Sequence, residues 1–72
     1  MAKEQKFTLT GKVVEAFPNT QFNVLLDDSE KIILAHLGGK LRIRHIRVTV
    51  EDRVEVQISP YDLTRGIIIR RL

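Results

Sequence analysis

Apolar and polar side chains alternate over several short stretches of the chain, which is the pattern of half-buried β-strands. The clearest alternation covers residues 53–58, where Val54, Val56 and Ile58 share one face and charged or amide side chains share the other. Pro60 ends this stretch because proline has no amide hydrogen to donate to a sheet. The same pattern predicts four further strands, at residues 7–14, 22–26, 31–37 and 67–69.

Turn-forming residues separate the predicted strands. Gly11 lies inside the first strand and indicates a bulge or a sharp bend there. Turns are predicted at residues 18–20 and 27–30, and a loop at residues 61–66. The pair Gly38-Gly39 ends the third strand, and residues 40–45 fit neither a helical nor a strand period, so a short helix and an irregular loop both stay open.

Five short strands with an irregular crossover between the third and the fourth predict an all-β fold, the five-stranded OB-fold Greek-key barrel. An SH3-like barrel is the competing architecture. The 72 residues predict one domain, residues 1–72. A chain of this size buries only about 60% of the surface that its unfolded form exposes, which leaves little room for a closed small-molecule cavity.

Composition excludes several classes of function. The chain has no cysteine, so disulfides, zinc–cysteine sites and thiol nucleophiles are excluded. Its two histidines are too few for a metal site without several carboxylates placed beside them. No nucleophile–base pattern or glycine-rich phosphate loop is present. We therefore expect no enzymatic activity, no cofactor, no metal and no small-molecule substrate.

The first ten residues bear on the location of the protein. They contain Lys3, Glu4 and Lys6, which argues against a secretory signal peptide. No apolar run approaches the roughly 20 residues that a membrane-spanning helix needs. We expect a soluble cytoplasmic protein that contacts no membrane, with a monomer as the default.

Positive charge is concentrated in two places, although the net charge is only +3. Residues 40–47 hold four lysine and arginine side chains and His45, with no acid among them, and Arg65, Arg70 and Arg71 form a second cluster. The nine acids lie elsewhere, so the folded protein should have a basic side. Guanidinium groups bind phosphates in a bidentate manner, which favours a nucleic-acid ligand.

Less specific explanations exist for parts of this charge. Residues 40–47 are also compatible with a solvated connection, and Arg70 and Arg71 with a charged terminus that protects an edge strand. Arg65 beside Gly66 is more typical of a turn than of a contact. We expect Leu41, Ile43 and Ile46 to plug one end of the barrel and to direct the arginines outward, and His36, inside an apolar strand, to be structural.

Aromatic side chains are scarce, and we expect most of Phe7, Phe17, Phe22 and Tyr61 to lie in the core. Proteins that bind single strands by base stacking usually display several aromatics on one face. The chain is better suited to a folded RNA whose shape and phosphates it reads. Two alternatives remain, a sequence-tolerant single-strand binder of the cold-shock type and a barrel whose basic face meets an acidic protein.

Six separated blocks resemble bacterial translation initiation factor one in order and spacing, over almost the whole chain. The blocks are residues 18–22, 35–36, 39–42, 46–47, 52–54 and 60–66, and the opening residues 1–4 are similar too. The resemblance implies an OB-fold without catalysis that binds the small ribosomal subunit at its A site, near the decoding helix of 16S-type rRNA and a neighbouring ribosomal protein. It also implies that the protein blocks premature tRNA binding there and supports initiation factors two and three.

The resemblance also implies site residues. In the family, the loop after the first strand enters the minor groove of the decoding helix; here that loop is residues 18–21, with Asn19 as the candidate contact. The family usually has an aromatic where His45 and Arg70 stand, a basic residue where Asn23 stands and arginine where Ile67 stands. We expect Arg44 and Arg70 to supply the positive charge that is missing at Asn23 and Ile67. The candidate rRNA-binding residues are Asn19, Lys40, Arg42, Arg44, His45, Arg47, Arg65, Arg70 and Arg71.

Overall fold

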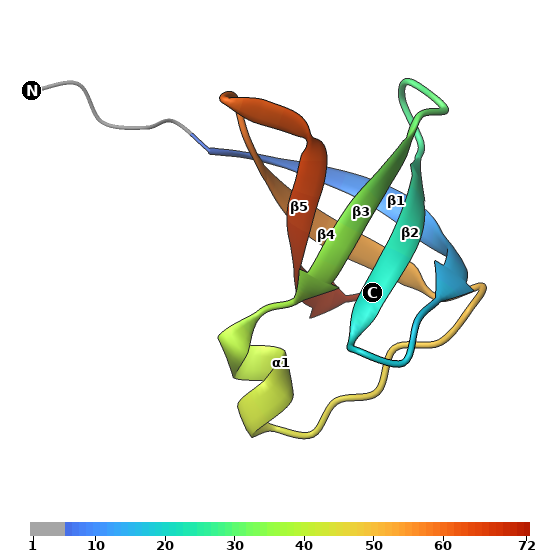
Figure 1. Ribbon diagram of the computed structural model, residues 1–72, viewed down its shortest axis with the longest axis vertical. Coiled ribbons are helices and arrows are strands. Elements are labelled where there is room, and N and C mark those ends of the chain that lie inside the picture. Colours follow the sequence, from blue (N-terminus) through green and yellow to red (C-terminus); the bar gives the residue numbers. More distant parts are fainter. Residues whose placement is uncertain (1–5) are drawn as a thin grey trace, which may run out of the picture.

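The computed structural model describes residues 6–72, so the predictions that rest on Lys3, Glu4 and the opening block lie outside the described residues. Five strands and one short helix follow in chain order: β1 (Phe7–Ala16), β2 (Gln21–Leu26), β3 (Ile32–Leu37), α1 (Gly39–Ile43), β4 (Arg53–Ser59) and β5 (Asp62–Arg71). The strands close into a barrel in the order β1-β2-β3-β5-β4, and α1 lies at one end of it (Figure 1). The predicted OB-fold is confirmed, and the segment left open between the third and fourth strands contains a helix.

The long strand β1 closes the barrel because it pairs with two other strands. It pairs with β4 from Phe7 to Lys12 and with β2 from Gly11 to Ala16. Gly11 lies where the two pairings overlap, and a Cβ atom there would stand 2.6 Å from the carbonyl oxygen of Leu25. A bulge or a sharp bend was predicted at Gly11; the register shift in the pairing of β1 with β2 lies further along, between Val13 and Glu15. Gly11 is needed for close approach of two backbones.

Among residues 6–72 the core contains twelve buried apolar side chains, drawn from all five strands, α1 and the segment before β4. The alternation predicted for the fourth strand is confirmed, with Val54, Val56 and Ile58 almost fully buried. Gly66 of β5 approaches closely enough that an added Cβ atom would meet the Ile33 side chain at 3.1 Å. A core built from alternate positions leaves the other face of each strand for solvent and ligands.

The loop predicted at residues 61–66 is wrong for all but its first residue, because β5 begins at Asp62 and extends to Arg71. Two neighbours provide hydrogen-bond partners that the local pattern does not reveal. Strand β3 pairs in parallel with β5, from Leu34 opposite Arg65 to Leu37 opposite Ile68, and β4 pairs with β5 antiparallel. Pairing with β4 at Asp62 and Gly66, and with β3 from Arg65 onward, keeps this stretch extended although its side chains are mostly polar.

Between residues 6 and 72 the structure contains only one helix, and its five residues are far too few to cross a membrane.

Candidate nucleic-acid interface

One end of the barrel collects four segments that are far apart in the sequence. They are the β1–β2 turn, α1, the segment that connects α1 to β4, and the end of β5 (Figure 1). This end, the basic end, brings together eight of the nine candidate residues, namely Asn19, Lys40, Arg42, Arg44, His45, Arg47, Arg70 and Arg71. All eight are exposed.

Helix α1 ends abruptly at its C-terminus, in a motif that two local hydrogen bonds define. The amide of Ile46 donates to the carbonyl of Leu41 at 3.0 Å, and the amide of His45 donates to the carbonyl of Arg42 at 3.1 Å. This is a Schellman motif, and it places His45 in the left-handed region at φ 55°. Leu41 is buried and Ile46 packs against the core, as expected for a plug. The same expectation is wrong for Ile43, which is 78% exposed because it lies on the outer face of the helix.

The β1–β2 turn is held against α1 by a side-chain contact. Arg42 donates from Nη2 to Oγ1 of Thr20 at 3.1 Å. Thr20 itself is at φ 61°, and its hydroxyl donates to the carbonyl oxygen of Asn19. The Asn19 amide donates to Oε1 of Gln21 at 3.0 Å. Sequence reasoning missed Thr20, since no residue pattern shows that a turn at residue 20 lies beside a helix at residue 42.

A hollow of about 650 Å³, here called the turn–helix hollow, lies between the β1–β2 turn and α1. Its floor includes Phe17, Phe22 and Leu41, and its rim carries Arg42, His45 and Arg47. An apolar floor beside cations suits a ligand that has both flat rings and phosphates. The part played by Phe17 was also missed, because a lone aromatic before Pro18 carries no signal of its own.

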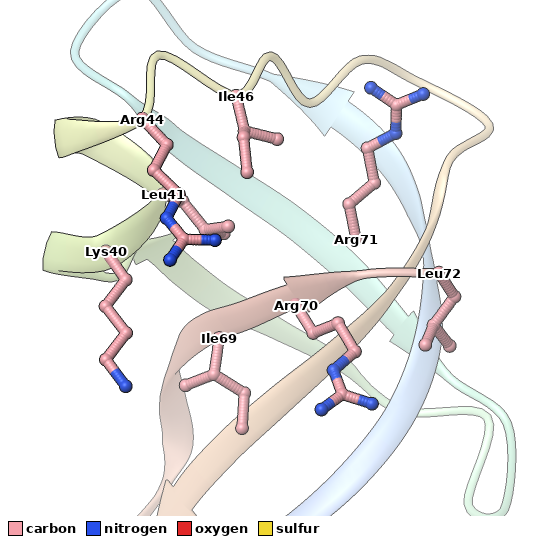
Figure 2. Close-up of a pocket in the computed structure, with 8 residues that line it drawn as sticks. All are labelled: Lys40, Leu41, Arg44, Ile46, Ile69, Arg70, Arg71 and Leu72. Atoms are coloured by element: carbon pink, nitrogen blue, oxygen red, sulfur yellow. The ribbon is translucent and has the colours of Figure 1, made fainter.

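A second concavity of about 570 Å³, here called the α1–β5 groove, lies between α1 and the end of β5 and shares Leu41 and Ile46 with the turn–helix hollow (Figure 2). Arg71 is among its lining residues, but its side chain extends away from those of Lys40, Arg44 and Arg70. Its Nη1 donates to the carbonyl of Arg47 at 3.1 Å, and its Nε lies 3.9 Å from a carboxylate oxygen of Asp52. Arg71 therefore anchors the connecting segment as well as adding charge.

Arg65 does not join the basic end. It lies opposite Leu34 on β5, beside a separate hollow of about 170 Å³ that Lys6, His36 and Asp62 also line. The pKa of Asp62 is held below its ordinary value, first by hydrogen bonds from the Thr64 hydroxyl and amide and then by the charge of Arg65. His36 is exposed on β3 and not enclosed in the core.

The aromatic side chains do not share a face. Only Phe22 is buried, and Phe17 is half-buried in the turn–helix hollow. Phe7, at the start of β1, is 40% exposed, and Tyr61, in the turn between β4 and β5, is 78% exposed. The expectation that most of the four are core is wrong, since this small barrel buries mainly Val, Ile and Leu. The scatter of the rings argues against a stacking platform for single strands.

A closed five-stranded barrel that carries a cluster of exposed cations at one end belongs to the class of small OB-fold proteins with a basic binding face. The family model "Translation initiation factor 1A / IF-1" matches residues 1–72. The chain belongs to this family: it is a translation initiation factor of the factor-one type, which is a non-enzymatic kind of protein.

Solved structures agree with this assignment. The solution structure of translation initiation factor one from the Wolbachia endosymbiont strain TRS of Brugia malayi is 42% identical, with a TM-score of 0.77. The match covers 93% of this chain and 78% of that one. YjeQ from Thermotoga maritima (30% identity, TM-score 0.75) and YloQ, a circularly permuted GTPase (25% identity, TM-score 0.75), are similar over 92% of this chain but only 23% of theirs. The same barrel thus also forms part of longer proteins.

Proposed function

We propose that this protein binds the decoding region of the small ribosomal subunit through rRNA contacts made by its basic end. There it keeps initiator tRNA out of the A site and supports initiation factors two and three, in the cytoplasm and as a monomer. The observation that carries the proposal is the convergence of cations from α1, the connecting segment and β5, beside the β1–β2 turn. Membership of the initiation-factor family supports ribosome association as the setting.

The charges of the basic end are available to an RNA backbone. Lys40, Arg44, Arg47 and Arg70 are exposed, and no side-chain ion pair or hydrogen bond holds any of them within residues 6–72. Each phosphate that they neutralise releases counterions. Contact with about five phosphates corresponds to a log-affinity against log-salt slope of roughly −3.5 to −4.5.

The turn–helix hollow favours a folded RNA over a nucleic acid that presents only its backbone phosphates. Unstacked bases in RNA loops and internal bulges are recognised through their faces and edges together with nearby phosphates. The hollow offers an apolar floor that contains Phe17, and Arg47 and His45 lie on its rim. A base that leaves its stack could rest on this floor while its phosphate meets the rim.

The test is binding to isolated small ribosomal subunits across a salt series, with chemical probing of the decoding-site adenines. Arg47→Gln should weaken binding by roughly fivefold or more and make the salt slope shallower by about 0.7–0.9. Lys31→Gln is the matched control, because Lys31 is an exposed cation in the β2–β3 turn at the opposite end of the barrel. The melting temperature of both variants should stay near that of the unmodified protein.

Saturable binding with altered reactivity of the adenines is the expected result. Unsaturable binding without any change at the decoding site would reject the proposal. Equal effects of Arg47→Gln and Lys31→Gln would show that net charge, and not the basic end, governs association.

A further inference from the structure

We propose that Asp52 is a positioning residue for RNA binding: its carboxylate holds the turn at residues 49–52 and thereby places Arg47 on the rim of the turn–helix hollow. The inference rests on the proposed function for its class of ligand. It adds that an acid, whose own charge repels phosphate, raises the affinity for RNA. Removing this negative charge should weaken binding, which is the opposite of what the charge alone predicts.

The carboxylate of Asp52 joins the connecting segment to itself and to β5. Its Oδ2 accepts hydrogen bonds from the amide of Thr49 at 2.9 Å and from the Thr49 hydroxyl at 3.2 Å. The same oxygen lies 3.9 Å from Nε of Arg71. The amide of Asp52 donates to the carbonyl of Thr49 at 3.1 Å, and this bond closes the turn. One half-buried side chain therefore fixes both ends of the turn.

The turn has a backbone conformation that its own residues disfavour. Glu51, the third of the four turn residues, has a φ of 81°. Together with the bond from the amide of residue 52, this is the pattern of a type II turn, whose third position favours glycine. A residue with a side chain is strained there. The turn therefore depends on contacts outside its own backbone preference, and the Asp52 carboxylate supplies those to Thr49.

Two contacts with β1 also hold Glu51. Its amide donates to the carbonyl of Val13 at 2.8 Å, and its carboxylate pairs with Lys12 at 3.1 Å. Both contacts hold the far side of the turn. They leave Thr49, which is the side that leads back to Arg47, to the carboxylate of Asp52.

The turn is linked to Arg47 through Arg71. Nη1 of Arg71 donates to the carbonyl of Arg47 at 3.1 Å, and Figure 2 shows the Arg71 side chain extending towards the connecting segment. On either side of Arg47, Ile46 packs against the core and Val48 is buried. This packing fixes the depth of the segment, and the bonds to Asp52 and Arg71 fix its orientation, with the Arg47 side chain exposed.

Two opposing effects of Asp52 on RNA binding can be compared. A preorganised Arg47 binds a phosphate with a smaller loss of side-chain and loop freedom, which raises affinity. The charge of Asp52 repels phosphate, but Arg71 partly neutralises it and salt screens exposed charges beyond about 10 Å at 0.1 M. We expect the positioning effect to be the larger one.

The test compares variants that each remove one negative charge. Asp52→Ala removes the charge and the acceptor, whereas Asp52→Asn keeps an oxygen that can accept from Thr49. Glu15→Gln is the matched control, because Glu15 is an exposed acid near the end of β1, beside the β1–β2 turn. Affinity for isolated small subunits is measured across a salt series. Asp52→Ala should bind roughly 3- to 10-fold more weakly and Asp52→Asn should lie between it and the unmodified protein. Glu15→Gln should bind as tightly as the unmodified protein or more tightly.

Glycine at residue 51 restores the turn without restoring the charge. Glu51→Gly relieves the strain of a positive φ, so the turn no longer depends on Asp52. Glu51→Gly with Asp52→Ala should therefore recover most of the affinity that Asp52→Ala loses. Glu51→Gln with Asp52→Ala has the same net charge but keeps the strain, and it should not recover the affinity. Equal affinities of these two double variants would show that the turn does not position Arg47.

A readout on the free protein is independent of the ribosome. Hydrogen exchange of the amide of residue 52, which closes the turn, should be faster in Asp52→Ala and slow again when Glu51→Gly is added. Unchanged exchange in Asp52→Ala would overturn the inference.

The inference and the proposed function fail in different ways. If the unmodified protein binds subunits saturably and Asp52→Ala binds as tightly as Glu15→Gln, the inference is wrong and the proposed function stands. If the unmodified protein does not bind subunits, the proposed function is rejected. The same variants titrated with a short RNA duplex then decide the inference, through the same order of affinities.

Discussion

Replacing Gly11 by alanine should destabilise the barrel through a single methyl group. The new Cβ atom would lie 2.6 Å from the carbonyl oxygen of Leu25, 2.7 Å from Cγ1 of Val24 and 3.1 Å from the carbonyl carbon of Leu25. Two of these three atoms belong to the backbone of β2, so no side-chain rotation relieves the overlap. Strand β1 must move away by several tenths of an ångström.

The movement is costly because β1 is held on both sides at this residue. Gly11 stands opposite Leu26 of β2 and Val54 of β4, and both partners are buried. Forcing extra volume into a packed interior costs about 1–3 kcal/mol. A domain of this size loses roughly 4–8 °C in melting temperature per kcal/mol, so we expect a fall of about 5–20 °C.

The measurement is thermal unfolding followed by circular dichroism, with urea unfolding for the free energy. Gly39→Ala is the matched control, because a Cβ atom there meets nothing within 4 Å and the residue begins α1. It should leave stability unchanged or raise it by up to about 1 kcal/mol. Melting temperatures of the two variants within about 2 °C of each other would refute the packing argument, since the expected gap is several times larger.

Two further variants test the backbone strain at His45 and the interactions of the Asp27 carboxylate. His45→Gly should raise stability by up to about 1 kcal/mol, because a non-glycine residue is strained in the left-handed backbone seen at φ 55°. The same variant should bind small subunits more weakly, since the imidazole leaves the rim of the turn–helix hollow; a drop in melting temperature would contradict the first half of this expectation. Asp27 has a pKa below its ordinary value of 3.8, first because Arg53 donates hydrogen bonds to it and then because Thr10 does. Its contribution to stability is therefore fully present above pH 4 and is lost as the pH falls through the lowered pKa of the folded state. Asp27→Asn should be less stable than the unmodified protein near pH 7, and the difference in melting temperature should shrink in acid; a difference that stays constant down to pH 2 would show that the ion pair is not its source.

The local pattern of side chains was enough to predict the class of fold. Strand alternation reports which face of a strand is buried, and the patterns of β2, β3 and β4 predicted those strands to within a residue or so of their observed bounds. Tertiary pairing decided what the pattern could not. Strand β5 starts at Asp62 because β4 pairs with it there and β3 joins from Arg65 onward. Ile43 is exposed because a single turn of helix leaves one face to solvent.

The sequence by itself determined which residues carry positive charge, where most of the strands run and that the family is that of initiation factor one. Only the tertiary structure decided how these charges are grouped. Arg70 lines the same groove as Lys40 and Leu41 of α1 because β5 passes beside β3, whereas Arg65, five residues earlier on the same strand, lies beside another hollow. The contact between Arg42 and Thr20 arises in the same way. Closure of the barrel brings distant segments to one end, and such long-range proximity leaves no periodic trace in the chain.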